Sequence, residues 1–477
     1  MKAINSTTTK RKPLPITILQ FGEGNFLRGF ADWMIDKINS EELTAHGVAV
    51  VQPIEQGISE LLNQQNCMYH VTLQGIKNGH PVKENRLISC IQTAINPYKE
   101  YNAYENLILS PDLKIILSNT TEAGIRYDDQ DDLSACPPKT FPAKVTALLY
   151  KRFKKFSGSA TSGLSIICCE LIEDNGSTLR SYVLAHAKRE NLGTSFIQWV
   201  TNNCFFYDTL VDRIVPGFPS DTISEIKEEL GYNDNLVVKG EYFHLWAIAG
   251  HPQIKELLPF DRAELNVVFT DNIHPIRTRK VRILNGTHTA ITSLAMQMNC
   301  FTVREAITHP LIHSYISKLV FGEIIPVIPE NQDKLCDYAS QILERFYNPF
   351  INHYLKDIAL NSLSKWETRN YPTVLDYYSK YKKIAVQSAF SLASLLILYS
   401  GKSRISFQPN DAPEAVHFIQ DTFNPDNPIL WIKNILENRS IWSNDFTQIP
   451  GFIELVSKIA ANIMAFGPEK ALYTIIE

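Results

Sequence analysis

An apolar run that ends in two glycines near the N-terminus limits the folds open to this chain. The run ITILQF covers residues 16–21 and is typical of a buried strand, and Gly22 and Gly24 follow it directly. An amphipathic helix is predicted next, through Phe30 and beyond. A strand, a glycine turn and a helix in this order open a dinucleotide-binding βαβ unit. The third glycine of the usual fingerprint would fall on Leu27, so a plain strand-to-helix turn is the alternative.

Apolar runs alternate with helical stretches over roughly the first 270 residues, a pattern that predicts a parallel sheet with helices on both faces. The predicted buried strands are 16–21, 48–53, 113–119 and 164–171. Helices are predicted over 29–38 and 143–153. The segment 75–82 is predicted to form a hairpin with Asn78 and Gly79 at its turn.

The pattern becomes mostly helical after His274 and Pro275, with amphipathic stretches at 338–346, 382–399 and 453–464. A chain of 477 residues with 44% hydrophobic content can bury two cores. We therefore expect an α/β protein: a doubly wound sheet domain of Rossmann type over residues 1–275, followed by a mainly α-helical domain over 276–477. The substrate is expected in the cleft between the two domains, with Lys280 at their junction.

Lys280, Asn285 and His288 lie in the run RTRKVRILNGTHTAITSLAM, which begins at Arg277. At about 100° per residue of α-helix, His288 lies roughly 80° from Lys280, and Asn285 lies roughly 60° beyond it. A lysine that exchanges a proton, beside two neutral hydrogen-bond donors, suits alcohol–ketone interconversion without a metal. The alternative is a solvated basic turn followed by a helix with Asn and His on its surface.

Several runs together, in order from residue 16 to the C-terminus, resemble the mannitol dehydrogenase family of polyol-specific long-chain dehydrogenases. The runs are GEGNFLRGF at 22–30, SNTTEAGI at 118–125, CELIEDNG at 169–176, TLVDRIVPG at 209–217 and KVRILNGTH at 280–288. Members that act on mannitol or fructuronate usually carry G-x-G-x-F-H-R-A-H at the first turn. This chain differs there, which favours the branch of the family that acts on tagaturonate and altronate.

The resemblance implies an enzyme that uses NAD for reversible hydride transfer, reducing D-tagaturonate to D-altronate in galacturonate breakdown without a metal. It assigns proton exchange to Lys280, and hydrogen bonds to the reacting oxygen to Asn285 and His288. Arg277, Arg279 and Arg282 would lower the pKa of Lys280 if they lie close to it. Fructuronate reductase and mannitol dehydrogenase are the alternatives within the family. A nucleotide-binding protein without catalysis is the alternative from another class.

The expected cofactor site surrounds the glycine turn and the ends of the neighbouring strands. Gln52 holds the strand end where NAD sites usually carry an acid, and it is expected to bond the ribose. Arg28 is expected either to contact a phosphate or to be a solvated helix residue. Asn119, Thr120 and Glu122 are candidate cofactor neighbours, and a helix cap formed by Thr120 or Thr121 is the alternative. The remaining candidates are Phe21, Gly22, Gly24, Asn25 and Phe26.

Two further residues are candidates for contact with the substrate. Asp208 stands where mannitol dehydrogenases carry an asparagine before the V-D-R-I run, and a carboxylate there would repel a sugar acid. Either Asp208 points elsewhere or the substrate is handled differently at this point. Arg369 is the candidate partner of the substrate carboxylate, because a guanidinium binds a carboxylate through two hydrogen bonds. A solvated arginine at a helix end is the alternative.

Charge and composition argue against several other classes of protein. With 46 basic and 50 acidic residues the net charge is −4, which gives no reason to expect nucleic acid as a partner. We expect no membrane segment and no signal peptide, and therefore a cytoplasmic protein. The eight cysteines form no C-x-x-C pair and are expected to stay reduced. No metal site is expected, and the sequence leaves the oligomeric state open.

Overall fold

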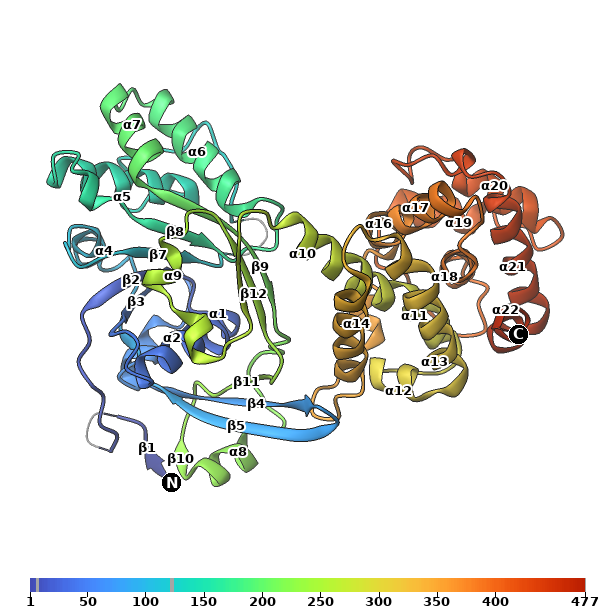
Figure 1. Ribbon diagram of the computed structural model, residues 1–477, viewed down its shortest axis with the longest axis horizontal. Helices are drawn as coiled ribbons and strands as arrows, with labels where there is room; N and C mark the ends of the chain where they lie inside the picture. Colours follow the sequence, from blue (N-terminus) through green and yellow to red (C-terminus); the bar gives the residue numbers. More distant parts are fainter. Residues whose placement is uncertain (6–7, 121–123, 477) are drawn as a thin grey trace. The chain divides into compact units, whose positions relative to one another are not determined.

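The computed structural model describes residues 1–5, 8–120 and 124–476 (Figure 1). Contacts divide the chain into two compact units. The first contains Met1–Gly75 and Pro81–Ile273, and the second contains Ile76–His80 and His274–Glu477. The division thus falls between residues 273 and 274, beside the boundary at 275 that the sequence predicts. We describe each unit by itself.

The first unit is built on an eight-stranded sheet in the order β13-β12-β9-β8-β7-β2-β3-β6. Pairing is parallel from β6 to β9, whereas β12 runs antiparallel to β9. Along the chain β2, β3, β6, β7 and β8 are the first to fifth strands of this sheet, and in the sheet they stand in the order 3-2-1-4-5, which is the arrangement of a dinucleotide-binding sheet. The strands are β2 (Ile16–Phe21), β3 (Gly47–Val51), β6 (Ile91–Ile95), β7 (Ile115–Ser118), β8 (Ser165–Cys168), β9 (Phe205–Asp212), β12 (Leu245–Ala249) and β13 (Val267–Thr270).

Each central strand is buried on both sides because its alternate residues enter two different cores. Ile18 of β2 packs in the core that includes α2, whereas its neighbour Leu19 packs in the core that includes α5. Val50 and Ala49 of β3 divide in the same way. A strand with two buried faces needs a continuous apolar run, which is why the sequence pattern predicted these strands correctly.

Helices cover both faces of this sheet (Figure 1). The helices of this unit are α1 (Asn25–Gly29), α2 (Ala31–Ser40), α3 (Ser59–Gln64), α4 (Tyr101–Ile108), α5 (Phe141–Lys155), α6 (Asn175–Arg189), α7 (Thr194–Asn203), α8 (Ile223–Leu230), which lies beside β10, and α9 (Ile254–Leu257), with 3₁₀ turns η1 (Ala160–Ser162) and η2 (Phe260–Ala263). Thr140 caps α5 by accepting a hydrogen bond from the Ala143 N–H.

The single helix predicted through Phe30 is wrong, because the backbone breaks at this residue. Phe30 has φ −126° and ψ −78°, so it ends α1 and precedes α2. Its side chain is fully buried and packs against Trp246 at a ring-centroid distance of 5.2 Å. Tertiary packing of this ring, which periodicity does not reveal, accompanies the break.

Two smaller sheets follow; the hairpin tip of one of them, Ile76–His80, is counted with the second unit. One pairs β1 (Lys2–Ala3) with β10 (Tyr232–Asn233), and the other has the order β11 (Val238–Glu241), β4 (Tyr69–Lys77) and β5 (His80–Ile88). The predicted hairpin between β4 and β5 is confirmed. Asn78 and Gly79 both have positive φ, 54° and 77°, as a two-residue type I′ turn requires.

The second unit is helical. Its helices are α10 (His274–Arg279), α11 (Gly286–Gln297), α12 (Val303–Thr308), α13 (Pro310–Ser317), α14 (Gln332–Phe346), α15 (Leu355–Ile358), α16 (Ser362–Arg369), α17 (Tyr371–Tyr381), α18 (Val386–Tyr399), α19 (Pro413–Asp421), α20 (Pro428–Leu436), α21 (Phe452–Phe466) and α22 (Pro468–Ile476). Two π-helical segments, η3 (Lys280–Asn285) and η4 (Lys318–Ile324), and two 3₁₀ turns, η5 (Ile325–Val327) and η6 (Phe446–Gln448), join them.

Helix α18 forms the centre of this unit. Every residue from Val386 to Tyr399 except Val386 is buried, and α18 packs against α11, α21 and α22. A helix that is apolar on all sides must be surrounded by others, as Figure 1 shows for α18. The stretch predicted over 382–399 begins later than expected, because Lys382 has φ 54° and ends α17.

The described residues contain no helix that is both long and apolar enough to span a lipid bilayer.

Candidate active site

The glycine turn after β2 contains one position with no room for a side chain, Gly22, and one with open space, Gly24. Gly22 has φ 119°, and a Cβ added to it would lie 2.8 Å from the Asn119 carbonyl oxygen, so only glycine fits there. Gly24 is exposed, and an added Cβ would meet no described atom within 4 Å. Packing within the protein therefore does not require a glycine at position 24. Close approach of a ligand phosphate to the backbone would require one.

Gly29 supplies the close packing that the sequence pattern left unassigned at Leu27. A Cβ on Gly29 would lie 2.7 Å from Cγ1 of Val238 in β11, so glycine lets α1 approach that strand. Leu27 is itself buried, with its Cδ1 near the turn at Gly22. The fingerprint is thus completed two residues later than the generic pattern.

The interpretation of Arg28 as a solvated helix residue is wrong, because the side chain is buried. Its three nitrogens donate to the Glu23 carbonyl at 3.0 Å, the Leu236 carbonyl at 2.6 Å and Oδ1 of Asn25 at 2.6 Å. The guanidinium also lies over the Tyr69 ring at 5.1 Å, and burial lowers its pKa. Arg28 therefore holds the glycine turn; it also lines the pocket beside that turn, and its contact with a cofactor phosphate stays a prediction.

Gln52 is also committed to the protein, so the expected ribose contact does not fit its geometry. Its Nε2 donates to the carbonyls of Ile54 and Glu55 at 2.9 and 2.7 Å. Its Oε1 accepts from the Ser59 hydroxyl at 2.8 Å and from the Ser59 N–H at 3.3 Å. Gln52 thus shapes the loop that follows β3 instead of facing a ligand.

Glu23 reaches the same loop and is a candidate that sequence reasoning missed. Its side chain accepts a hydrogen bond from the Ile58 N–H, and its Oε1 lies where a Cβ on Gly57 would collide. Burial raises the pKa of this carboxyl group. The sequence signal for Glu23 is its place as an acid between Gly22 and Gly24. The carboxylate beside the end of β3 therefore comes from the glycine turn and not from β3 itself.

A pocket of about 370 Å³ opens beside this turn in the first unit. Its lining includes Glu23, Gly24 and Asn25 together with Ile58 and Phe218.

Two further candidates, Phe26 and Phe21, pack within the protein. Phe26 stacks on Phe30 at 5.0 Å, and Phe21 is fully buried, with its ring edge-on to Tyr104 and Phe141.

The segment after β7 is tied to the end of β8. The Asn119 amide donates to the Cys169 carbonyl at 3.0 Å, and the Thr120 N–H and hydroxyl donate to Oε1 of Glu170 at 3.0 and 2.9 Å. The alternative of a helix cap at Thr120 or Thr121 involves residues 121–123, which lie outside the described residues. The side chains of Asn119 and Thr120 stand at the carboxyl edge of parallel strands, where ligands bind in such sheets. Glu122 and Thr121 lie outside the described residues.

The side chain of Asp208 points toward the start of helix α6. Its two carboxylate oxygens accept from the N–H and the hydroxyl of Ser177, at 2.8 and 2.6 Å, in the first turn of α6. A carboxylate is favourable at a helix N-terminus. Of the two sequence alternatives, the structure supports the one in which Asp208 points elsewhere, which corrects its assignment as a substrate contact.

Lys280 and Asn285 are the first and last residues of the π-helical segment η3. The Gly286 N–H donates to the Val281 carbonyl, which is the i→i+5 hydrogen bond of a π-helix. Residues five apart therefore lie about one turn apart, and this changes the α-helical spacing assumed from the sequence. His288 follows in α11, three residues after Asn285 and on the same helix face. The π turn thus draws Lys280 toward the face that carries the amide and the imidazole.

Two arginines that flank Lys280 are paired with carboxylates. Arg282 Nη1 lies 2.6 Å from Oδ2 of Asp376, and Arg279 Nη1 lies 3.8 Å from Oε1 of Glu330. Their charges are therefore offset locally, and they exert less influence on Lys280 than unpaired arginines would.

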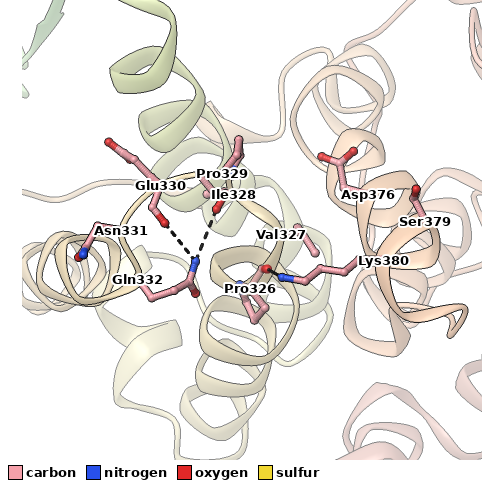
Figure 2. Close-up of a pocket in the computed structure, with 10 residues that line it drawn as sticks. All are labelled: Pro326, Val327, Ile328, Pro329, Glu330, Asn331, Gln332, Asp376, Ser379 and Lys380. Atoms are coloured by element: carbon pink, nitrogen blue, oxygen red, sulfur yellow. Dashed lines mark hydrogen bonds between the residues drawn. The ribbon is translucent and has the colours of Figure 1, made fainter.

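Glu330 and Asp376 also line a pocket of about 810 Å³ in the second unit (Figure 2). In it, Lys380 Nζ donates to the Pro326 carbonyl at 2.6 Å, and Gln332 bonds the turn carbonyls of Ile328 and Glu330. Glu330 and Asp376 pair with Arg279 and Arg282, which flank Lys280, so this polar pocket borders η3.

His288 is held in a buried and cationic environment. Its side chain is only 8% exposed, and its ring stacks on Phe346 at 4.4 Å and meets His353 edge-on at 4.8 Å. Burial lowers the pKa of His288 well below its usual value, and His353, Arg345 and Arg369 act in the same direction. The imidazole is therefore neutral near pH 7, a state in which it donates one hydrogen bond.

Arg369 lies close enough to His288 for its charge to lower the pKa of that ring. It ends α16, which packs against α11, and its Nη1 donates to the hydroxyl of Thr289 at 3.1 Å. Burial alone lowers its pKa, and no carboxylate of the described residues pairs with it. A half-buried guanidinium without a counterion is costly unless a ligand supplies the anion.

Within the described ranges, no group of three or more His, Cys, Asp or Glu side chains is placed to hold a metal ion.

Comparison with known proteins agrees with this arrangement over nearly the whole chain. Residues 16–260 match the mannitol dehydrogenase Rossmann domain, and residues 272–464 match the mannitol dehydrogenase C-terminal domain. The chain belongs to the mannitol dehydrogenase family. The resemblance drawn from the sequence runs and the expected two-part fold are thereby confirmed. Family membership makes the protein an oxidoreductase acting on a CH–OH group, against the alternative of a binding protein without catalysis.

Relatives within the family are similar to this chain over almost all of their length. The altronate oxidoreductase of Bacillus subtilis (strain 168) is 42% identical over 96% of this chain and 95% of its own. The altronate oxidoreductase of Phocaeicola vulgatus is 40% identical over 96% of both chains. Mannitol 2-dehydrogenase of Pseudomonas fluorescens, solved with NAD and D-mannitol, has a similar fold, with a TM-score of 0.73 and 21% identity, over 100% of this chain and 96% of that one.

Proposed function

We propose that this protein catalyses the NAD-dependent interconversion of D-tagaturonate and D-altronate, acting as a tagaturonate reductase in galacturonate breakdown. The relatives of about 40% identity are named for altronate, which supports this branch of the family. The observation that carries the proposal is the unpaired guanidinium of Arg369 beside His288, because a sugar acid supplies the missing anion and a neutral polyol does not.

Lys280 is the proposed acid and base. In reduction, its ammonium group gives a proton to the oxygen that becomes the new hydroxyl, and in oxidation its neutral amine takes that proton back. When bound, NADH supplies the hydride that reaches the carbonyl carbon. The Asn285 amide and the neutral His288 donate hydrogen bonds to the same oxygen, which stabilises its developing charge by about 3–4 kcal/mol per donor.

Arg369 is the proposed partner of the substrate carboxylate. Its guanidinium carries five N–H donors, and the one described bond, to Thr289, leaves donors for a carboxylate. Two parallel N–H···O bonds fix the direction of the sugar chain as well as its charge. The same reasoning predicts weaker binding of D-fructose, which has the hydroxylated chain without the carboxylate.

The first unit has the features that a nicotinamide dinucleotide needs. Gly22 turns the chain where no side chain fits, and Gly24 leaves open space beside the pocket at the turn. Glu23 places a carboxylate near the end of β3, so it can accept from ribose hydroxyls in place of the acid that usually ends that strand. An acid at this point also disfavours the additional phosphate of NADP. We assign Gly22, Glu23, Gly24 and Asn25 to the cofactor, with Asn119 and Thr120 at the neighbouring strand end.

The test is NADH oxidation by purified protein offered D-tagaturonate, D-fructuronate and D-fructose separately. We expect clear preference for tagaturonate in kcat/KM. A Lys280→Ala variant should lose kcat by a factor on the order of 10²–10⁴ while it still binds NADH. Lys433→Ala, which changes an exposed lysine of α20, is the control. Preference for fructuronate or fructose would refute tagaturonate as the substrate and leave the proposed hydride transfer with Lys280 unchanged.

A second comparison tests the carboxylate contact. Arg369→Met should raise the KM for tagaturonate by about 10–100-fold, since hydrogen bonds to a charged group each contribute about 1.5–3 kcal/mol. The KM for any slow turnover of fructose should change much less. Arg304→Met, at an exposed arginine of α12, is the matched control. An equal change for both substrates would refute a contact specific to the carboxylate.

A further inference from the structure

The orientation of the His288 ring is not explained by His288 itself. Its Nε2 is buried, and no hydrogen-bond partner for it exists among the described residues. An unpaired buried nitrogen is unfavourable, so a ring that could turn freely would turn away from this position. Moreover, the χ2 torsion of histidine is broad and roughly two-fold, so rotamer preference does not fix the ring plane.

Two rings in contact with His288 supply the missing restraint. Phe346, the last residue of α14, stacks nearly parallel to the imidazole, with 4.4 Å between centroids and 17° between planes. His353 meets the imidazole at 84° with 4.8 Å between centroids. A parallel neighbour limits tilting of the ring, and a perpendicular neighbour limits its rotation, so the pair together defines one plane.

The backbone around His353 is anchored firmly enough for this role. Its carbonyl accepts from the Val303 N–H at 3.0 Å, and the Leu355 N–H donates to the Phe301 carbonyl at 2.9 Å. An isolated β-bridge joins Thr302 to Tyr354 between these bonds. His353 thus lies in a short segment pinned on both sides to the chain that begins α12, although no helix or strand contains it.

We propose that His353 is a positioning residue for the reaction, which together with Phe346 holds the His288 ring so that one nitrogen stays directed at the reacting oxygen. This inference rests on the proposed role of His288 as a hydrogen-bond donor. It concerns the shape of the His353 ring and not proton transfer by it. A flat aromatic ring without nitrogen, such as the phenyl ring of phenylalanine, should therefore serve nearly as well, whereas a small side chain should not.

The test compares His353→Ala, His353→Phe and His353→Gln with the wild-type chain in NADH-dependent reduction of D-tagaturonate. We expect His353→Ala to lower kcat by about 10–100-fold, as misplacement of a catalytic group does, with the KM for substrate changed less than about twofold. His353→Phe should restore kcat to within about threefold of wild type, and His353→Gln should not. His313→Ala, which removes an exposed histidine of α13, should have no effect.

A second measurement separates failure of this inference from failure of the proposed function. Carbon-13 NMR of histidine-labelled protein without substrate reports the tautomer and ring motion of His288, assigned with a His288→Gln variant. One sharp tautomer in wild type and in His353→Phe, with exchange broadening in His353→Ala, would support the clamp even if tagaturonate is not the substrate. Wild-type kcat in His353→Ala, or a sharp unchanged His288 signal in that variant, would overturn it, as would full rescue by glutamine.

Discussion

Asp32 of α2 is a carboxyl group that folding removes from water entirely, and its replacement by asparagine gives a quantitative prediction. Its Oδ2 accepts from Gln20 Nε2 at 3.1 Å and from the Tyr69 hydroxyl at 3.4 Å. Its Oδ1 and the Oε1 of Gln20 have no partner among the described residues. Burial raises the pKa of Asp32 to about 7, although Gln20 and Arg28 oppose this.

The sign of the pH effect follows from this direction. Because the folded pKa lies above the unfolded value, the folded state binds the Asp32 proton more tightly, and stability falls as pH rises from about 4 to about 7. A difference of roughly 3 pKa units corresponds to about 4 kcal/mol, all of which is lost above pH 7. Asp32→Asn removes the ionisation, and its amide can donate to Gln20. We therefore expect the variant to gain about 2–3 kcal/mol over wild type between about pH 5 and pH 8.

Urea unfolding of the full chain at both pH values measures this difference. Comparing variant with wild type at each pH cancels the titration of every other group. Asp421→Asn, at an exposed acid of α19, is the control and should show no pH-dependent difference. A stability difference between Asp32→Asn and wild type that stays constant or shrinks as pH rises would refute the reasoning.

Three further substitutions test the site. Gly29→Val should lower the free energy of unfolding by about 1–3 kcal/mol, because its side chain meets Val238 in β11; an unchanged melting temperature would contradict this. Gln52→Ala should raise the Kd for NADH severalfold by loosening the loop after β3, without changing the KM for the sugar acid at saturating NADH. Asp208→Asn should leave the KM for the sugar acid within about twofold, since the carboxylate bonds Ser177; a larger rise in steady-state assays would return Asp208 to the substrate.

The parts of the fold that the sequence predicted are those in which one local pattern has one structural solution. The run at 16–21 is apolar at every position but two, and a short run of this kind fits a strand buried on both faces. Asn78 and Gly79 tolerate positive φ, so their place between two strands predicts the hairpin. The change to helical periodicity after residue 274 likewise follows from side-chain spacing alone.

The remaining features depend on partners that are distant in the chain. Arg28 bonds the carbonyl of Leu236, and Phe30 breaks its helix while packed against Trp246. No spacing rule reveals either contact. Gln52 differs from Arg28 and Phe30, because its hydrogen bonds are local. Whether its amide turns toward its own loop or toward a ligand nevertheless depends on the conformation of that loop, which the sequence pattern does not reveal. Among the candidate residues, Arg369 lies near His288, and the roles expected for both stay predictions, whereas Asp208 bonds Ser177 of the scaffold.

The relative positions of Lys280 and Asn285 in the motif KVRILNGTH depend on the π-helical backbone of η3. If these residues were grafted onto an ordinary α-helix of a designed enzyme, Lys280 and Asn285 would be separated by about 140° around the axis and would lie on different faces of the helix. The i→i+5 bond from Gly286 to Val281 closes most of that angle in this chain. A designer who transplants the chemistry must therefore carry over the widened turn or delete one residue between the lysine and the asparagine, which gives them the i, i+4 spacing of an α-helix.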